Sequence, residues 1–310
     1  MTQPPDHAVV VDAVPDDVKP IAEAIRKNEC LLFLGAGVHS RPPDGSPYEY
    51  AEEHRPLRGG ELAAKLADKS RWDLDEEPQN LGRVALYSEI KRGFGRKRLI
   101  DEVRLAVHEG KQPSPALMAL AELDFPMIAT TNYDQLFEQS LRAHGRKPSI
   151  SIYKPERDRD TDDYVGRPFP TPDAPFVVKL HGDIDRPESI VITDEDYIHF
   201  VLRMGDPERF HPLTQTLKFG LSKHVILFIG YSLLDYNLRL LFKTIRWQVD
   251  KATMQPSYAV DPFPDRLIRN VYDDLGGFVQ FIVRDVWSFV PMLYRELKGR
   301  EMPSGQEVAR

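Results

Sequence analysis

The sequence predicts an α/β protein built on a doubly wound, mostly parallel, Rossmann-like sheet with an inserted helical module. Short apolar runs such as Cys30 to Leu34 and Val225 to Ile229 alternate with segments of helical spacing along most of the chain. Several of these runs end at glycine or small polar residues, where a strand would turn into the next helix. Strands separated by helices favour parallel pairing, which places all of these corners at one edge of the sheet.

Composition places the chain among ordinary globular proteins. It has 310 residues, of which 41% are hydrophobic and 29% charged, so it can bury a full core. A formal net charge of -7 gives no general electrostatic attraction to nucleic acid or anionic membranes, and any contact with nucleic acid is expected to be indirect. The acidic start of the chain and the lack of a long apolar run predict a cytoplasmic protein without a membrane span.

The single cysteine, Cys30, limits the chemistry that the chain can perform. One thiol forms no intramolecular disulfide and no cysteine-based zinc cluster. We therefore expect a reducing compartment and no metal centre.

The predicted elements divide the chain into one domain with an insertion. We expect the domain to cover residues 16–300, with flexible termini at 1–15 and 301–310. Helical spacing without an intervening strand predicts a helical insertion over about residues 60–112, which follows a Pro- and Gly-rich loop at 41–59. The basic cluster from Lys91 to Arg98 in this insertion is interpreted as a solvated helix face.

Apolar patterning predicts the elements outside the insertion. Helices are expected at 18–28, 113–123, 135–144, 194–204, 213–221, 235–247, 264–275 and 286–298. Strands are expected at 30–34, from 127 onward, and at 176–178, 189–192, 225–229, 257–260 and 278–283. The last helix carries Trp287, Phe289, Leu293 and Tyr294, an apolar set that fits core packing and an interface equally well.

Four corners carry the residues that point to chemistry. Along the chain they read Gly35-Ala36-Gly37, Thr130-x-Asn132-x-Asp134, Leu180-His181-Gly182 and Gly230-x-Ser232. Glycine lets backbone N–H groups approach a phosphate closely. Polar side chains at the second corner need partners if they are buried, and an imidazole is the commonest general base. A satisfied loop histidine or a tight turn would explain any one corner, but four polar corners together indicate a site.

As a set, these corners resemble the Sir2 (sirtuin) family, and more closely the bacterial Sir2-like NAD-consuming proteins of anti-phage defence. The resemblance runs from about Leu31 to Asp285 and includes Leu57 to Ala63, Ile190 to Tyr197 and Gly230 to Leu238. The family's first corner usually reads Gly-Ala-Gly-x-Ser, whereas here His39 pushes Ser40 one place on. Residues 184–222 contain no cysteine, so the four-cysteine zinc ribbon of the family's protein deacylases is missing and deacylation is disfavoured.

The resemblance implies a role for each corner residue, with NAD as the substrate. Gly35, Ala36 and Gly37 would hold the pyrophosphate of NAD. Asn132 and Asp134 would face the nicotinamide and its ribose, and His181 would be the catalytic histidine. Further contacts to NAD would come from Gly230 and Ser232 on the adenosine side, and from Ser40, Thr131, Asp261 and Asp285.

The implied reaction is the cleavage of NAD+ to nicotinamide and ADP-ribose. The resemblance suggests an NAD+ glycohydrolase that acts as a defence effector and depletes NAD when it is activated. Two alternatives use the same corners: an ADP-ribosyl cyclase, and a non-enzymatic sensor of NAD or ADP-ribose. Because uncontrolled loss of NAD is toxic, we expect restraint through a homo-oligomer or through a separately encoded sensor or ATPase partner.

Overall fold

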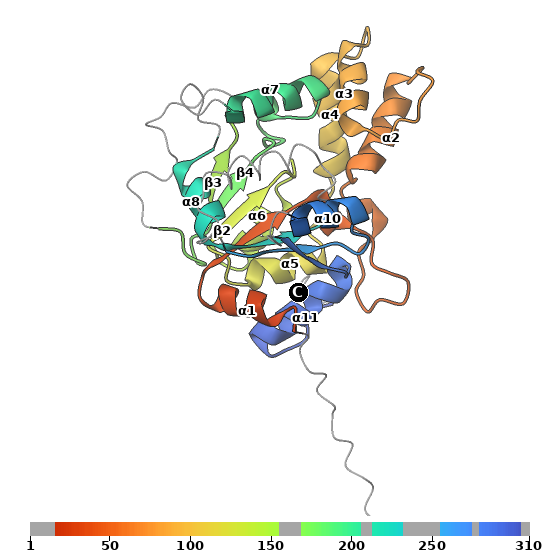
Figure 1. Cartoon of the computed structure of the whole chain (residues 1–310). Coiled ribbons are helices and arrows are strands. Elements are labelled where there is room, and N and C mark those ends of the chain that lie inside the picture. Colours follow the sequence, from red (N-terminus) through yellow and green to blue (C-terminus); the bar gives the residue numbers. More distant parts are fainter. Residues whose placement is uncertain (1–15, 155–168, 206–212, 232–254, 275–278, 305–310) are drawn as a thin grey trace, which may run out of the picture.

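The protein folds around one seven-stranded parallel sheet (Figure 1). This computed structural model describes residues 16–154, 169–205, 213–231, 255–274 and 279–304. In spatial order the strands run β3 (Ser149–Ile152), β4 (Phe176–Lys179), β2 (Met127–Thr130), β1 (Cys30–Leu34), β5 (Val225–Ile229), β6 (Ser257–Val260) and β7 (Val279–Ile282). Every neighbouring pair is parallel, which confirms the predicted fold class.

The strand order changes direction at the centre of the sheet. From β1 the chain builds β2 and then the β4–β3 edge on one side, and it later returns to place β5, β6 and β7 on the other side. The crevice between the carboxyl ends of β1 and β5 is therefore the topological switch point, where open α/β sheets bind ligands. All five residues of β1 and of β5 are buried, as expected for central strands covered on both faces.

Helices cover both faces of the sheet. One face packs against α1 (Lys19–Arg26), α5 (Pro115–Glu122), α6 (Leu136–Ala143) and α11 (Val286–Lys298). The other face packs against α7 (Asp194–Gly205), α8 (Gln215–Lys223) and α10 (Arg266–Asp274). The apolar side chains of α11, Trp287, Phe289, Leu293 and Tyr294, are at most 5% exposed and belong to the first of these cores.

A third apolar core holds the helical module, which lies beside α7 and away from the middle of the sheet (Figure 1). The module consists of α2 (Gly59–Ser70), α3 (Leu81–Ile90) and α4 (Gly95–Val107). Its core includes Leu62, Val84 and Val103, together with Tyr133, Ile184 and Ile192 from the sheet side. The module is therefore packed against the segments that follow β2 and β4.

Two predictions of secondary structure differ from the structure. Residues Ser189 to Ile192 form no strand, because a 3-10 turn at Pro187–Ser189 leads into an irregular buried segment whose Val191 N–H donates to the His181 carbonyl. The edge strand β3 was not predicted from the sequence, since its alternating Ser-Ile-Ser-Ile pattern is short and follows a helix closely. It pairs with β4 and completes that side of the sheet.

Several sequence predictions fall on residues that the structure leaves undescribed. These are the helix at 235–247, the flexible leader at 1–15 and Ser232. Among the described helices, none is long and apolar enough to cross a membrane.

Candidate active site

The first corner of the site is a close contact between the ends of β1 and β5. The Gly35 N–H donates to the Ile229 carbonyl at 3.0 Å, and the Gly37 N–H donates to the Gly230 carbonyl at 2.8 Å. A Cβ atom on Gly35 would lie 2.5 Å from the Gly230 oxygen, and one on Gly37 would lie 2.8 Å from the same atom. Gly230 itself has a φ of 69°, in the left-handed region. Glycine at these positions is required for the two strand ends to touch.

These hydrogen bonds limit the backbone N–H groups that the corner could offer to a phosphate. The sequence prediction assigned the pyrophosphate to Gly35, Ala36 and Gly37 as a group. In the structure the N–H groups of the two glycines are already bonded to the β5 corner. Within the described backbone, Ala36 is the residue of this triplet whose N–H is not used in such a bond. The corner therefore offers a phosphate the Ala36 N–H and a surface without side chains.

The second corner follows β2 and presents an unpaired carboxamide oxygen. The Thr130 hydroxyl donates to the Leu34 carbonyl at 3.0 Å and accepts the Asn132 N–H at 3.0 Å, which ties this corner to the end of β1. The Asn132 side-chain oxygen is buried and has no hydrogen-bond partner among the described residues. A buried acceptor without a partner is costly, and a ligand in the cavity that supplied a donor would remove this cost.

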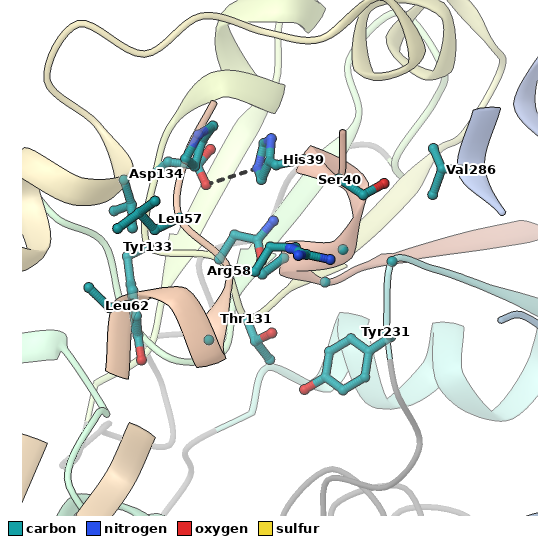
Figure 2. A pocket seen from close by; sticks show the side chains of 18 of the residues that line it. His39, Ser40, Leu57, Arg58, Leu62, Thr131, Tyr133, Asp134, Tyr231 and Val286 are labelled. Carbon is teal, nitrogen blue, oxygen red and sulfur yellow. Dashed lines mark ion pairs between the residues drawn. The ribbon is translucent and has the colours of Figure 1, made fainter. Parts of the chain in front are cut away.

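Asp134 and His39 form a buried pair in the same cavity (Figure 2). The His39 Nε2 lies 3.3 Å from the Asp134 Oδ2, and the two residues are 3% and 5% exposed. The alignment of these atoms does not meet hydrogen-bond geometry, so the contact is electrostatic. The other Asp134 oxygen accepts the Leu136 N–H at 2.9 Å. Burial alone would raise the pKa of Asp134, but the His39 imidazole, the Lys179 ammonium and this N–H together hold it below its usual value.

The third corner follows β4 and buries His181. Gly182 has a φ of 88°, and a Cβ atom there would collide with the backbone carbonyl of Ser189. The His181 ring packs edge-on against Tyr197 and Phe200 of α7, with centroids 5.2 and 5.4 Å away. Burial lowers the pKa of His181 to about 3, because removal from water disfavours the charged imidazolium. The side chain is therefore neutral at physiological pH.

Lys179 joins the second and third corners from behind the cavity. Its ammonium lies 3.0 Å from Glu138 and 2.8 Å from Asp183, and it donates to the backbone carbonyl of Asp134. The Lys179 side chain is fully buried, and burial by itself would lower its pKa, but the surrounding carboxylates raise it above the usual value. A permanently charged ammonium at this point holds the Asp134 segment next to the strand that leads to His181.

These corners line one cavity of about 500 Å³. Of the residues predicted from the sequence, the cavity is lined by Gly35, Ala36, Gly37, Ser40, Thr131, Asn132, Asp134, His181, Gly230, Asp261 and Asp285. Ser232 lies outside the described residues. The structure thus brings together residues that are up to 250 positions apart in the sequence, from Gly35 to Asp285.

The cavity also contains residues that sequence reasoning did not assign to it. The helical module and the loop before it contribute Pro56, Leu57, Arg58, Gly59, Leu62, Leu81 and Val107, several of which are drawn in Figure 2. His39 was also missed, although its place in the serine position of the family motif was a signal. The remaining lining residues that were not predicted are Tyr133, Tyr197, Tyr231, Val260, Pro262 and Val286. The described residues contain no group of three or more His, Cys, Asp or Glu side chains arranged to hold a metal ion.

Comparison with known proteins agrees with this geometry. Residues 126–276, which include the Asn132, His181 and Gly230 corners, match the family model of the SIR2-like domain. This part of the chain is similar to SIR2-like domains. This finding confirms the resemblance that the corner motifs carry.

The chain is also similar to curated bacterial proteins. It is 26% identical to the NAD(+) hydrolase ThsA of Acinetobacter baumannii over 296 residues, which cover 90% of this chain and 55% of that protein. It is 28% identical to the NAD(+) hydrolase ThsA of Enterococcus faecium over 78% of this chain and 45% of that protein. It is 22% identical to the defense-associated sirtuin 2 of Bacillus subtilis over 80% of this chain and 22% of that protein. The chain spans about half the length, or less, of these relatives.

Proposed function

We propose that this protein is an NAD+ glycohydrolase, which cleaves NAD+ to nicotinamide and ADP-ribose. The observation that carries the proposal is the convergence of Asn132, Asp134 and His181 on a cavity whose other wall is the glycine contact between β1 and β5. Two of the similar proteins bear the name NAD(+) hydrolase, which supports the same reaction for this chain. A dinucleotide would lie across the switch point, with its nicotinamide toward the β2 and β4 corners.

The first chemical requirement is to stabilise positive charge on the ribose. The C1′–N1 bond breaks with its electron pair moving to the pyridinium nitrogen, which leaves neutral nicotinamide and an oxocarbenium-like sugar. The Asp134 carboxylate is ionised, since its pKa is lowered, and it is buried at the cavity wall. A carboxylate in such a water-poor site stabilises the developing cation more than it would in water. The Asn132 oxygen can accept a hydrogen bond from the nicotinamide carboxamide or from the attacking water.

The second requirement is to direct a nucleophilic water to C1′. A neutral His181 ring can accept a hydrogen bond from this water or from a ribose hydroxyl. Its low pKa makes it a weak base, but water that bonds to a cationic carbon becomes acidic, so a weak acceptor is sufficient. The water proton is released as its oxygen bonds to C1′, and ADP-ribose forms.

The remaining cavity residues fit the rest of the dinucleotide. Ser40 and Thr131 lie near the glycine corner, and Gly230, Asp261 and Asp285 line the part of the cavity beyond β5. Asp261 accepts the Phe263 N–H and Asp285 caps α11 by accepting the Ser288 N–H, so both carboxylates are held in place. Each carboxylate has an oxygen that could accept a hydrogen bond from an adenosine ribose hydroxyl.

The experiment is to incubate the purified protein with NAD+ and separate the products by chromatography. We expect equal amounts of nicotinamide and ADP-ribose, and a loss of at least about 100-fold in rate for Asn132→Ala and for His181→Ala. The matched control is His224→Ala, which removes a similarly buried histidine between α8 and β5, outside the cavity. Parent-like turnover by either site variant would contradict the assigned roles. Cyclic ADP-ribose as the main product, or binding of NAD+ without turnover, would replace hydrolysis with a cyclase or a sensor.

The biological setting is proposed on the same basis. We propose a defence effector that depletes NAD when it is activated, because one similar protein is named an NAD(+) hydrolase and another a defense-associated sirtuin. Its restraint would come from assembly as a homo-oligomer, or from a separately encoded sensor or ATPase partner. Light scattering of the purified chain measures the first possibility, and a monomeric mass at all concentrations would exclude it.

A further inference from the structure

We propose that His39 is a positioning residue for Asp134: it keeps this carboxylate ionised and directed at the cavity, and so sets the lowest pH at which the protein cleaves NAD+. The proposal rests on the proposed function for its kinetic part. It concerns the one place where this chain departs from the Gly-Ala-Gly-x-Ser pattern.

The position of His39 follows from the short 3-10 turn that ends β1. Residues Ala36–His39 form this turn directly after Gly35, and the turn is held by the bond from Gly37 to the β5 corner. The Ser40 carbonyl accepts the Trp287 indole N–H at 3.0 Å, which fixes the residue that follows. Backbone restraints on both sides of His39 therefore point its ring at Asp134, as Figure 2 shows.

Among the described residues, His39 has no polar partner except Asp134. Both ring nitrogens are buried, and neither makes an aligned hydrogen bond. The only charged atom recorded within ion-pair distance of the ring is the Asp134 Oδ2, at 3.3 Å. A histidine that only filled space would bury two polar atoms at a cost, which an apolar side chain of similar size would avoid. The favourable interaction of the ring with the Asp134 carboxylate offsets this cost.

The effect of His39 on Asp134 has a definite sign. Burial is the largest influence on the pKa of Asp134 and acts to raise it, and the attraction of His39 is the largest of the opposing influences. Without His39, the Lys179 charge and the Leu136 N–H remain, but the balance moves toward the neutral acid. A carboxyl with a depressed pKa is ionised above that pKa and loses its charge as the pH falls through it. Removal of His39 therefore moves this loss of charge to higher pH.

The other groups that act on the pair come from four neighbouring elements. Lys179 of β4 favours the ionised carboxylate. The pKa of Glu138 of α6 is raised by its burial and, to a smaller extent, by repulsion from Asp134, so Glu138 opposes the ionised carboxylate. The Tyr50 hydroxyl, on the loop before the helical module, has its pKa raised by burial and by Asp134. His181 is neutral because of its own burial. All of these groups stay in place in a His39 variant, so a changed titration of Asp134 reports on His39.

The test compares His39→Leu and His39→Gln with the parent over pH 5 to 9. For His39→Leu we expect the acid limb of the kcat/KM profile to move to higher pH, so that kcat/KM falls to about a tenth of the parent value at pH 5 and falls less at pH 8. His39→Gln retains a polar side chain with an N–H donor at this position, and we expect an intermediate shift. His224→Leu is the matched control, because it removes another buried imidazole without touching the cavity, and its profile is expected to match the parent.

A second measurement does not depend on catalysis. The side-chain carboxyl of Asp134 is titrated by ¹³C NMR in the ligand-free protein, with Asp134→Asn used to assign its signal. We expect a higher titration midpoint in His39→Leu than in the parent, and an unchanged midpoint in His224→Leu. An unchanged midpoint in His39→Leu would overturn the proposal, and so would a shifted midpoint with an unmoved acid limb. If the parent does not cleave NAD+, the proposed function fails, while the titration still decides whether His39 controls the carboxylate.

Discussion

At the scale of single residues, the site depends on glycines that allow two strand ends to touch. Gly230 combines a left-handed φ of 69° with a neighbour, the Val38 backbone nitrogen, that a Cβ atom would overlap. Gly145 has a similar φ of 73°, but a Cβ atom there would meet nothing within 4 Å. The two positions therefore separate the cost of an unusual backbone angle from the cost of a steric clash.

We expect Gly230→Ala to destabilise the protein by about 3 kcal/mol or more and to weaken NAD+ binding, because the β1 and β5 corners are forced apart. Gly145→Ala is expected to cost only about 1 kcal/mol, the price of the backbone angle alone. Urea unfolding measures both values. Equal destabilisation by the two substitutions would show that close packing of the corners contributes little.

At the scale of elements, helix α4 secures the segment that follows His181. Arg96 contacts Asp196 at 2.7 Å and donates to the Ile190 carbonyl at 2.7 Å, and Arg104 contacts Asp185 at 2.7 Å. The basic cluster was predicted to form a solvated helix face. That prediction fits Lys97, whose side chain is 92% exposed, but not Arg96. Through these contacts the helical module supports the His181 corner as well as closing one side of the cavity.

We expect Arg96→Gln to loosen residues 184–196 by about 1 to 2 kcal/mol, because a charge-assisted bond to a backbone carbonyl is lost in a partly exposed setting. The Val191 amide, which donates to the His181 carbonyl, is then expected to exchange its hydrogen about tenfold faster. Hydrogen exchange by NMR provides the measurement. Lys97→Gln removes an exposed pair of the same helix and is the control; parent-like exchange in both variants would contradict a supporting role for α4.

At the scale of the whole molecule, the sheet places the cavity at its switch point and the three apolar cores surround it. Residues of the β1, β2, β4, β5 and β6 corners, of α11 and of the helical module all line the cavity. A ligand that contacts so many separate elements stabilises the folded state as a unit, because the unfolded chain has no such site.

We expect ADP-ribose at about 100 times its dissociation constant to stabilise the protein by about 2.7 kcal/mol, which corresponds to a rise of roughly 4 °C in Tm for a chain of this size. Differential scanning fluorimetry measures this shift. Free adenine at the same concentration serves as the control, since it lacks the pyrophosphate and the second ribose. No shift with ADP-ribose would contradict dinucleotide binding in the cavity.

Much of the fold could be predicted because local pattern and final structure agree. The continuous apolar run at 30–34 is too short for a typical helix and ends at a glycine corner, which favours a strand buried on both faces. The helical spacing at 286–298 favours an apolar partner on one side. The strand predicted at 189–192 was wrong. This segment is apolar because it is buried against the helical module, and it does not pair in the sheet. A buried irregular segment and a paired strand both appear in the sequence as a short apolar run.

The sequence by itself determined the parallel sheet, the helical module and the identity of the polar corner residues, since strand periodicity and corner chemistry are written in short stretches of chain. Only the tertiary structure decided that His39 faces Asp134, that Lys179 binds the Asp134 segment, and that the glycine N–H groups are bonded to β5. These contacts join residues that are distant along the chain. Their pairing depends on how neighbouring strands end in space, which no local pattern records.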